Sequence, residues 1–100
     1  MARKKIIADF NAGDTVTPNA DLLLQVHNGS DDSIIPTANY ADIGSVNTPG
    51  TDGANFVATL LGSEVTLDGV DLGDPLPISI KVRCKDADGN ESELSYAFDI

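Results

Sequence analysis

The sequence is short of basic residues, and this shortage excludes whole classes of partner. Its 100 residues contain six Lys and Arg against 16 Asp and Glu, which gives a net charge of −10. Nucleic-acid binding needs clustered cations that displace counterions from phosphates, so we expect no nucleic-acid partner. An anionic membrane surface would repel the same charge, so we also expect no membrane partner.

Cysteine is nearly absent, because Cys84 is the only one in the sequence and no intramolecular disulfide can form. Small secreted domains usually depend on several disulfides, so we expect a protein made and kept in a reducing cytoplasm. The apolar run after the basic start ends at Asp9, well short of the ~7–15 apolar residues of a secretion signal. No stretch approaches the ~20 apolar residues of a membrane span.

Helix-forming patterns are also scarce. The chain has three Glu, one Gln and no long stretch with apolar residues at helical spacing. Short alternating runs separated by Asp, Asn, Gly, Pro and Thr fill the sequence instead, and 41% apolar residues suffice for a core. We therefore predict one all-β domain over residues 1–100, an antiparallel β-sandwich of about seven short strands, with residues 1–5 as a basic N-terminal arm.

The last quarter of the chain has the clearest strand pattern. Apolar and polar residues alternate over 78–85 and again over 94–100, with a polar loop between them. This pattern predicts an antiparallel hairpin with one face on the core. The core-facing residues are predicted to be Ile78, Ile80, Val82, Cys84, Leu94, Tyr96, Phe98 and Ile100.

Earlier strands are predicted from shorter patterns. They are Lys4–Phe10, Asp21–His27, Asn55–Leu61 and Val65–Leu72, the last divided by a turn at Asp68-Gly69. Residues 40–51 show no clear pattern and are predicted to be a long loop. Phe10 and Phe56 lie within strand patterns and are expected in the core.

The stretch from Leu72 to Ser92 resembles the final two strands of fibronectin type III and related immunoglobulin-like domains. Its loop residues Asp86, Gly89, Asn90 and Ser92 match the loop of that family, and Ile80, Val82 and Cys84 match its buried face. The family usually has a Trp in its second strand and a Tyr where the penultimate strand begins. This chain has no Trp and has Ile78 at the Tyr position, so the resemblance implies the architecture and no functional site.

The protein as a whole resembles the auxiliary or decoration proteins of tailed-phage capsids. The likeness lies in its size and general character, because it is an acidic, cysteine-poor, immunoglobulin-like chain of 100 residues. It implies a non-enzymatic structural protein of a virion, assembled in the host cytoplasm. The implied partner is the major capsid protein or another virion protein, bound in many copies on a symmetric assembly.

All six basic residues lie in two clusters, and no Lys or Arg occurs from Ile6 to Ile80. An acidic body with two basic spots predicts docking on an acidic surface. The alternative is that a solvated strand face pairs with the protein's own acids. The candidate partner-binding residues are Arg3, Lys4, Lys5, Lys81, Arg83 and Lys85.

Other chemistry finds little support in the residues. The Asp86–Glu91 loop has carboxylates in a tight turn, as calcium loops do, but it lacks further ligand positions and is better explained as a hairpin turn. His27 and Cys84 could form a nucleophilic pair only if they met, and Cys84 is expected to be a small buried apolar residue. We expect no cofactor, no metal and no enzymatic activity. The alternative function is an adhesion or glycan-binding module, for which Tyr40 is the one free aromatic candidate.

Overall fold

The computed structural model describes residues 6–10, 16–17, 21–45, 48–49, 54–58, 63–67 and 71–100. The strands are β1 (Ile6–Phe10), β2 (Leu22–Asn28), β3 (Ala41–Ser45), β4 (Thr48–Pro49), β5 (Ala54–Ala58), β6 (Ser63–Leu67), β7 (Ser79–Lys85) and β8 (Phe98–Asp99). One 3-10 helix, η1 (Pro36–Ala38), is the only helix in these ranges. The prediction of an all-β antiparallel protein is therefore confirmed. None of the described residues belongs to a helix that is long and apolar enough to cross a membrane.

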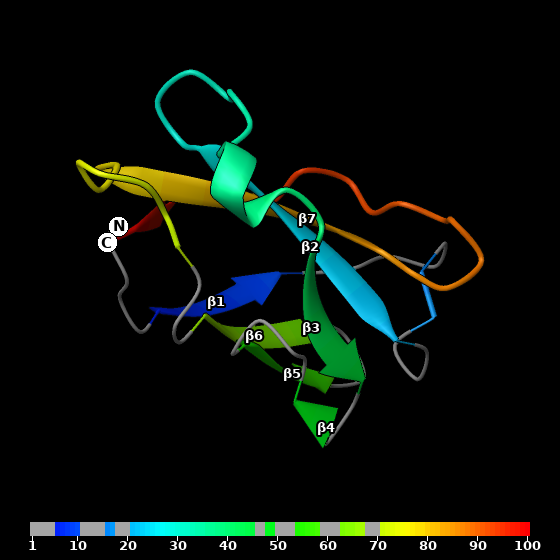
Figure 1. Cartoon of the computed structure of the whole chain (residues 1–100). Coiled ribbons are helices and arrows are strands. Elements are labelled where there is room, and N and C mark those ends of the chain that lie inside the picture. Colours follow the sequence, from blue (N-terminus) through cyan, green and yellow to red (C-terminus); the bar gives the residue numbers. More distant parts are fainter. Residues whose placement is uncertain are drawn as a thin grey trace.

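The strands form two antiparallel sheets (Figure 1). The larger sheet has the order β4-β3-β2-β7-β8, and the smaller has the order β1-β6-β5. Strand β5 lies close to β3 and β4, so the two sheets adjoin at these strands. All pairings are between antiparallel neighbours.

Strands β2 and β7 form the centre of the larger sheet. Their register pairs Leu24 with Cys84 and Val26 with Val82. Both strands alternate apolar residues with others, so this register brings the two apolar sets to the same face. The sequence pattern thus specifies a pairing between segments from opposite halves of the chain.

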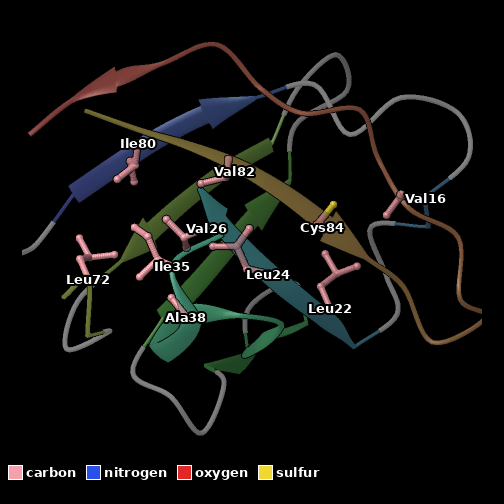
Figure 2. Close-up of a cluster of buried hydrophobic side chains, with 10 residues drawn as sticks. All are labelled: Val16, Leu22, Leu24, Val26, Ile35, Ala38, Leu72, Ile80, Val82 and Cys84. Atoms are coloured by element: carbon pink, nitrogen blue, oxygen red, sulfur yellow. The ribbon is translucent and has the colours of Figure 1, made fainter. Parts of the chain in front are cut away.

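The core is built on that face (Figure 2). Leu22, Leu24 and Val26 from β2 pack with Ile80 and Val82 from β7, and all five are fully buried. The remaining members of the cluster come from the segments around these strands and are Val16, Ile35, Ala38, Leu72 and Cys84. Phe98 and Ile100 pack against it from the C-terminal end.

The prediction of a long loop over residues 40–51 is wrong, because β3 and β4 occupy much of this range. Gly44 has φ 85°, and the pairing with β2 shifts between Leu22 and Leu23. Asp42 accepts a hydrogen bond from the Gly44 amide at 2.9 Å. The glycine and this side-chain contact interrupt the alternation of apolar and polar residues in β3, so the sequence pattern does not identify it as a strand. Pairing with the neighbouring strand β2 holds it in the sheet.

Two residues predicted to face the core are exposed instead. Ile78 is 81% exposed because it precedes the first residue of β7, at the end of the core. Tyr96 is 88% exposed, and β8 spans two residues where a strand over 94–100 was predicted. The predicted hairpin therefore has regular strand pairing only at its open end, and a single bridge joins Lys85 to Glu91 next to the turn. Phe10 and Phe56 lie in β1 and β5, and their side chains fall outside the described part of the chain.

Candidate functional site

The basic residues of β7 form a stripe on the face of the larger sheet opposite the core. Lys81, Arg83 and Lys85 alternate with buried residues and are each partly buried themselves. We call these three residues the β7 stripe. Their placement on one face follows the prediction from alternation.

Each cation of the stripe contacts a residue of this chain. Lys81 Nζ lies 2.7 Å from Asp32 Oδ1, and Arg83 Nη1 lies 3.9 Å from Glu91 Oε2. Both pairs are partly exposed. The accessible share is 25% for the Lys81 and 55% for the Asp32 side chain, and 32% for the Arg83 and 45% for the Glu91 side chain. Exposed pairs contribute roughly 0–1 kcal/mol, so a carboxylate of a partner can compete with them.

Arg83 also carries a donor that the described residues leave unused. Its Nε is buried and has no hydrogen-bond partner within the described part of the chain. A buried polar group without a partner costs free energy and calls for an explanation.

Tyr40 closes the other end of the stripe. Lys85 Nζ lies 4.1 Å from the centroid of the Tyr40 ring, and the Tyr40 hydroxyl donates to Glu91 Oε1 at 2.9 Å. Loss of solvent, followed by the hydrogen bond to Glu91, raises the pKa of the Tyr40 hydroxyl. The sequence suggests that Tyr40 is a free aromatic residue. In the structure, the Lys85 ammonium group lies over one face of its ring.

The N-terminal candidates Arg3, Lys4 and Lys5 lie outside the described residues. The sequence did not predict that Asp32, Tyr40 and Glu91 contact the stripe. The antiparallel bridge between Lys85 and Glu91 is the feature that brings Glu91 there. It depends on the exact path of the chain after β7, which the composition of the loop does not reveal.

His27 and Cys84 are not brought together. His27 pairs with Lys81 in the sheet, and its Nδ1 donates to the Asp32 carbonyl at 2.9 Å. Its Nε2 lies 2.7 Å from Gln25 Oε1, so the ring is held within the larger sheet. Cys84 is fully buried on the core face, and burial raises the pKa of its thiol. The prediction that Cys84 is a buried apolar residue is confirmed.

Asp86 organises the turn after β7. The residue is 4% exposed, and its carboxylate accepts hydrogen bonds from the backbone N–H groups of Thr17 (3.1 Å), Asp88 (3.0 Å) and Asn90 (2.9 Å). It also accepts one from Asn90 Nδ2 at 3.2 Å. Among the described residues no group of three or more His, Cys, Asp or Glu could hold a metal ion. The Asp86 oxygens instead complete a hairpin turn and tie the turn to Thr17.

This arrangement predicts a pH dependence of stability. Burial raises the pKa of Asp86, but the hydrogen bonds from Asn90, Thr17 and Asp88 together outweigh it and lower the pKa. A carboxyl with a lowered pKa stabilises the fold above its unfolded-state pKa and loses this effect as pH falls through its folded-state pKa. In Asp86→Asn we expect a lower Tm at neutral pH, and a difference from the parent that shrinks in strong acid.

Thermal unfolding by circular dichroism between pH 7 and pH ~2.5 measures that difference. Asp88→Asn is the matched control, because it removes an exposed carboxyl from the same turn. Equal pH profiles for the two variants would contradict the assignment.

Comparison of the chain with protein-family models, with curated proteins and with solved structures finds no match.

Proposed function

We propose that this chain is a non-enzymatic structural protein of a phage virion, an immunoglobulin-like domain that docks on the capsid surface as an auxiliary or decoration protein. The order of the strands supports the architecture. In the immunoglobulin fold one sheet contains strands B, E and D, and the other can contain G, F, C, C′ and C″. With β1 taken as strand B, the two sheets of this chain follow the same orders.

The observation that carries the docking proposal is the segregation of charge. The six cations lie in two clusters, and the stretch between them holds eleven Asp and Glu without a Lys or Arg. The β7 stripe places three of these cations, each partly buried, on the sheet face opposite the core. An acidic patch on a capsid protein would complement such a stripe. The rest of the chain is acidic, so it would face the solvent and repel other copies of the same chain.

The contacts of the stripe support displacement by a partner. Its ion pairs with Asp32 and Glu91 are partly exposed, and pairs of this kind are weak. Carboxylates on a capsid surface would replace the internal acids at small cost. Many copies on a symmetric shell would then add avidity to a modest single contact.

The glycan-binding alternative draws less support from these contacts. Sugar rings stack on exposed aromatic faces. Lys85 occupies one face of the Tyr40 ring and Glu91 accepts from its hydroxyl, so one stacking face and the hydroxyl are engaged within the chain.

The docking proposal predicts salt-sensitive binding through the basic clusters. Capsids purified from the phage and host that carry this sequence are mixed with the chain and sedimented in an analytical ultracentrifuge at low and high salt. Changing Lys81, Arg83 and Lys85 together to Gln should weaken co-sedimentation by ~10-fold or more at low salt, and Arg3, Lys4 and Lys5 to Ala should weaken it similarly.

The matched control is the double change of Lys81 and Lys85 to Arg, which keeps both positive charges. It should co-sediment like the parent chain. A chain that stays monomeric and joins no capsid at either salt concentration would overturn the docking proposal, and a glycan-array screen with Tyr40→Ala as control would then test the alternative.

A further inference from the structure

The strand β8 begins a register that the rest of the C-terminal segment does not keep. Ser79 pairs with Asp99 and Ile80 pairs with Phe98. Continued toward the turn, this register would set Tyr96 opposite Val82 and Leu94 opposite Cys84. The apolar residues of both segments would then share the core-facing side, as their alternation predicts.

The chain slips out of this register twice. Ser95 N donates to the Val82 carbonyl at 2.9 Å, and Ser92 N donates to the Cys84 carbonyl at 2.9 Å. Each two-residue step along β7 is therefore matched by three residues of the C-terminal segment. One extra residue is accommodated at each step, as in a β-bulge.

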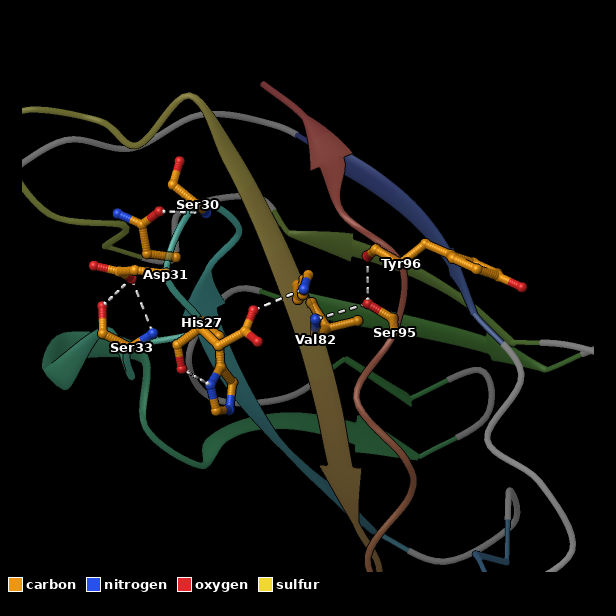
Figure 3. Close-up of polar contacts among 10 residues, drawn as sticks. His27, Ser30, Asp31, Ser33, Val82, Ser95 and Tyr96 are labelled. Carbon is orange, nitrogen blue, oxygen red and sulfur yellow. Dashed lines mark hydrogen bonds and ion pairs between the residues drawn. The ribbon is translucent and has the colours of Figure 1, made fainter.

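A serine hydroxyl sits at the first of these slips. Val82 N donates to Ser95 Oγ at 2.8 Å, and the same hydroxyl donates to the Tyr96 carbonyl at 2.8 Å (Figure 3). The register of β8 would join Val82 N–H directly to the Tyr96 carbonyl. The hydroxyl is thus inserted between the two groups that would otherwise bond to each other, as a bridging water would be.

The second slip repeats the arrangement. Cys84 N donates to Ser92 Oγ at 3.0 Å, and that hydroxyl donates to the Glu93 carbonyl at 3.1 Å. The two hydroxyls keep β7 amides satisfied while the segment runs out of register. The consequence is that Tyr96 is 88% exposed, although Phe98 and Ile100 of the same alternating set pack on the core.

We propose that residues 92–97 form an edge strand with two registers. In the open register, which the structure describes, Ser92 and Ser95 are inserted and Tyr96 lies in water. In the closed register, the Ser95 hydroxyl withdraws, Val82 N–H bonds to the Tyr96 carbonyl, and Tyr96 and Leu94 join Phe98 on the core-facing side. The number of bonds to β7 is kept, and apolar area leaves water.

The turn at Asp86 holds the open register. Its carboxylate fixes Asp88 and Asn90, and Asp86 N donates to the Asn90 carbonyl at 3.0 Å, so that Glu91 follows directly opposite Lys85. A change to the closed register removes the extra residue at each slip and lengthens this turn by two residues. Glu91 then moves away from Arg83 and Tyr40. The two-register strand concerns the chain alone and stands whether or not the capsid proposal holds.

Nuclear magnetic resonance separates the two registers, because couplings across hydrogen bonds identify the acceptor of an amide. In the parent chain the Val82 amide should show no coupling to a backbone carbonyl carbon, since a hydroxyl accepts its bond. In Ser95→Ala we expect a coupling from Val82 to the Tyr96 carbonyl, with ring contacts between Tyr96 and Val82. Ser95→Thr keeps a hydroxyl and should behave like the parent.

A folded Ser95→Ala chain whose Val82 amide exchanges with water, and whose Tyr96 ring stays exposed, would overturn the proposal. Thiol trapping provides a second measurement, with Cys84 as the built-in partner. Leu94→Cys is opposite Cys84 only in the closed register, and Ser92→Cys is next to it only in the open register.

Mild oxidation followed by mass spectrometry measures how fast each introduced cysteine forms a disulfide with Cys84. The measurement is made first in chains that keep Ser95. Leu94→Cys should react with Cys84 faster than Glu93→Cys, whose side chain points away in the closed register. Adding Ser95→Ala should speed the Leu94→Cys trap roughly tenfold and slow the Ser92→Cys trap. Equal rates for Leu94→Cys and Glu93→Cys, with or without Ser95, would show that the closed register does not form.

Discussion

Changing Leu24 to Ala should lower the free energy of unfolding by about 2–5 kcal/mol, the largest effect that we expect from a single substitution. Leu24 is fully buried at the centre of the core cluster, opposite Cys84 in the β2–β7 pair. Its removal loses the transfer free energy of the side chain and leaves a cavity that both central strands line. Since small domains are stable by roughly 5–15 kcal/mol, this change takes a large share of the total.

Urea unfolding followed by far-ultraviolet circular dichroism measures the change. Leu23→Ala is the matched control, because Leu23 precedes Leu24 in the same strand, points to the other face and is only partly buried. A loss for Leu24→Ala no greater than for Leu23→Ala would contradict the position of the core.

Changing Gly29 to Ala should cost about 1–3 kcal/mol, because a methyl group has no room there. Gly29 follows β2 and donates its amide to the Ser79 carbonyl at 2.8 Å. A Cβ on Gly29 would collide with Ser79 Oγ and would lie 3.0 Å from both the Cβ and the carbonyl carbon of Ser79. The hydroxyl can rotate away, but the backbone of β7 cannot move without disturbing its pairing with β2.

A double-mutant cycle with Ser79→Gly tests this explanation. Ser79→Gly removes the hydroxyl and the Cβ, so Gly29→Ala should cost distinctly less in that background, as judged from urea unfolding. If the two changes add without coupling, contact with the Ser79 side chain is not the reason for the glycine.

The sequence predicts the central strands well because they alternate without interruption. Leu22–Asn28 and Ser79–Lys85 each present one apolar face, and each lies within two residues of the strand predicted for it. The β3 and β4 strands could not be predicted, because Gly44 and Pro49 break the alternation and only the neighbouring strands hold them in the sheet. Local pattern is a weak guide where tertiary pairing decides.

The sequence predicts the cations of the candidate site but not the residues of this chain that contact them. Alternation is enough to set Lys81, Arg83 and Lys85 on one face. The register of the C-terminal segment decides that Glu91 meets Arg83 and Tyr40. That register depends on hydroxyl contacts of Ser92 and Ser95, which no pattern of apolar and polar residues encodes.

The pairing of β2 with β7 also has a consequence for the order in which the protein is made. A ribosome releases Leu22, Leu24 and Val26 long before Ile80 and Val82, so the apolar face of β2 waits for its partner. Through this interval the nascent chain has no Lys or Arg after Lys5, and eleven carboxylates accumulate before Ile80. Repulsion between these charges should keep unfinished chains on one polysome apart until β7 emerges and pairs with β2, so that the apolar residues of both strands join one core.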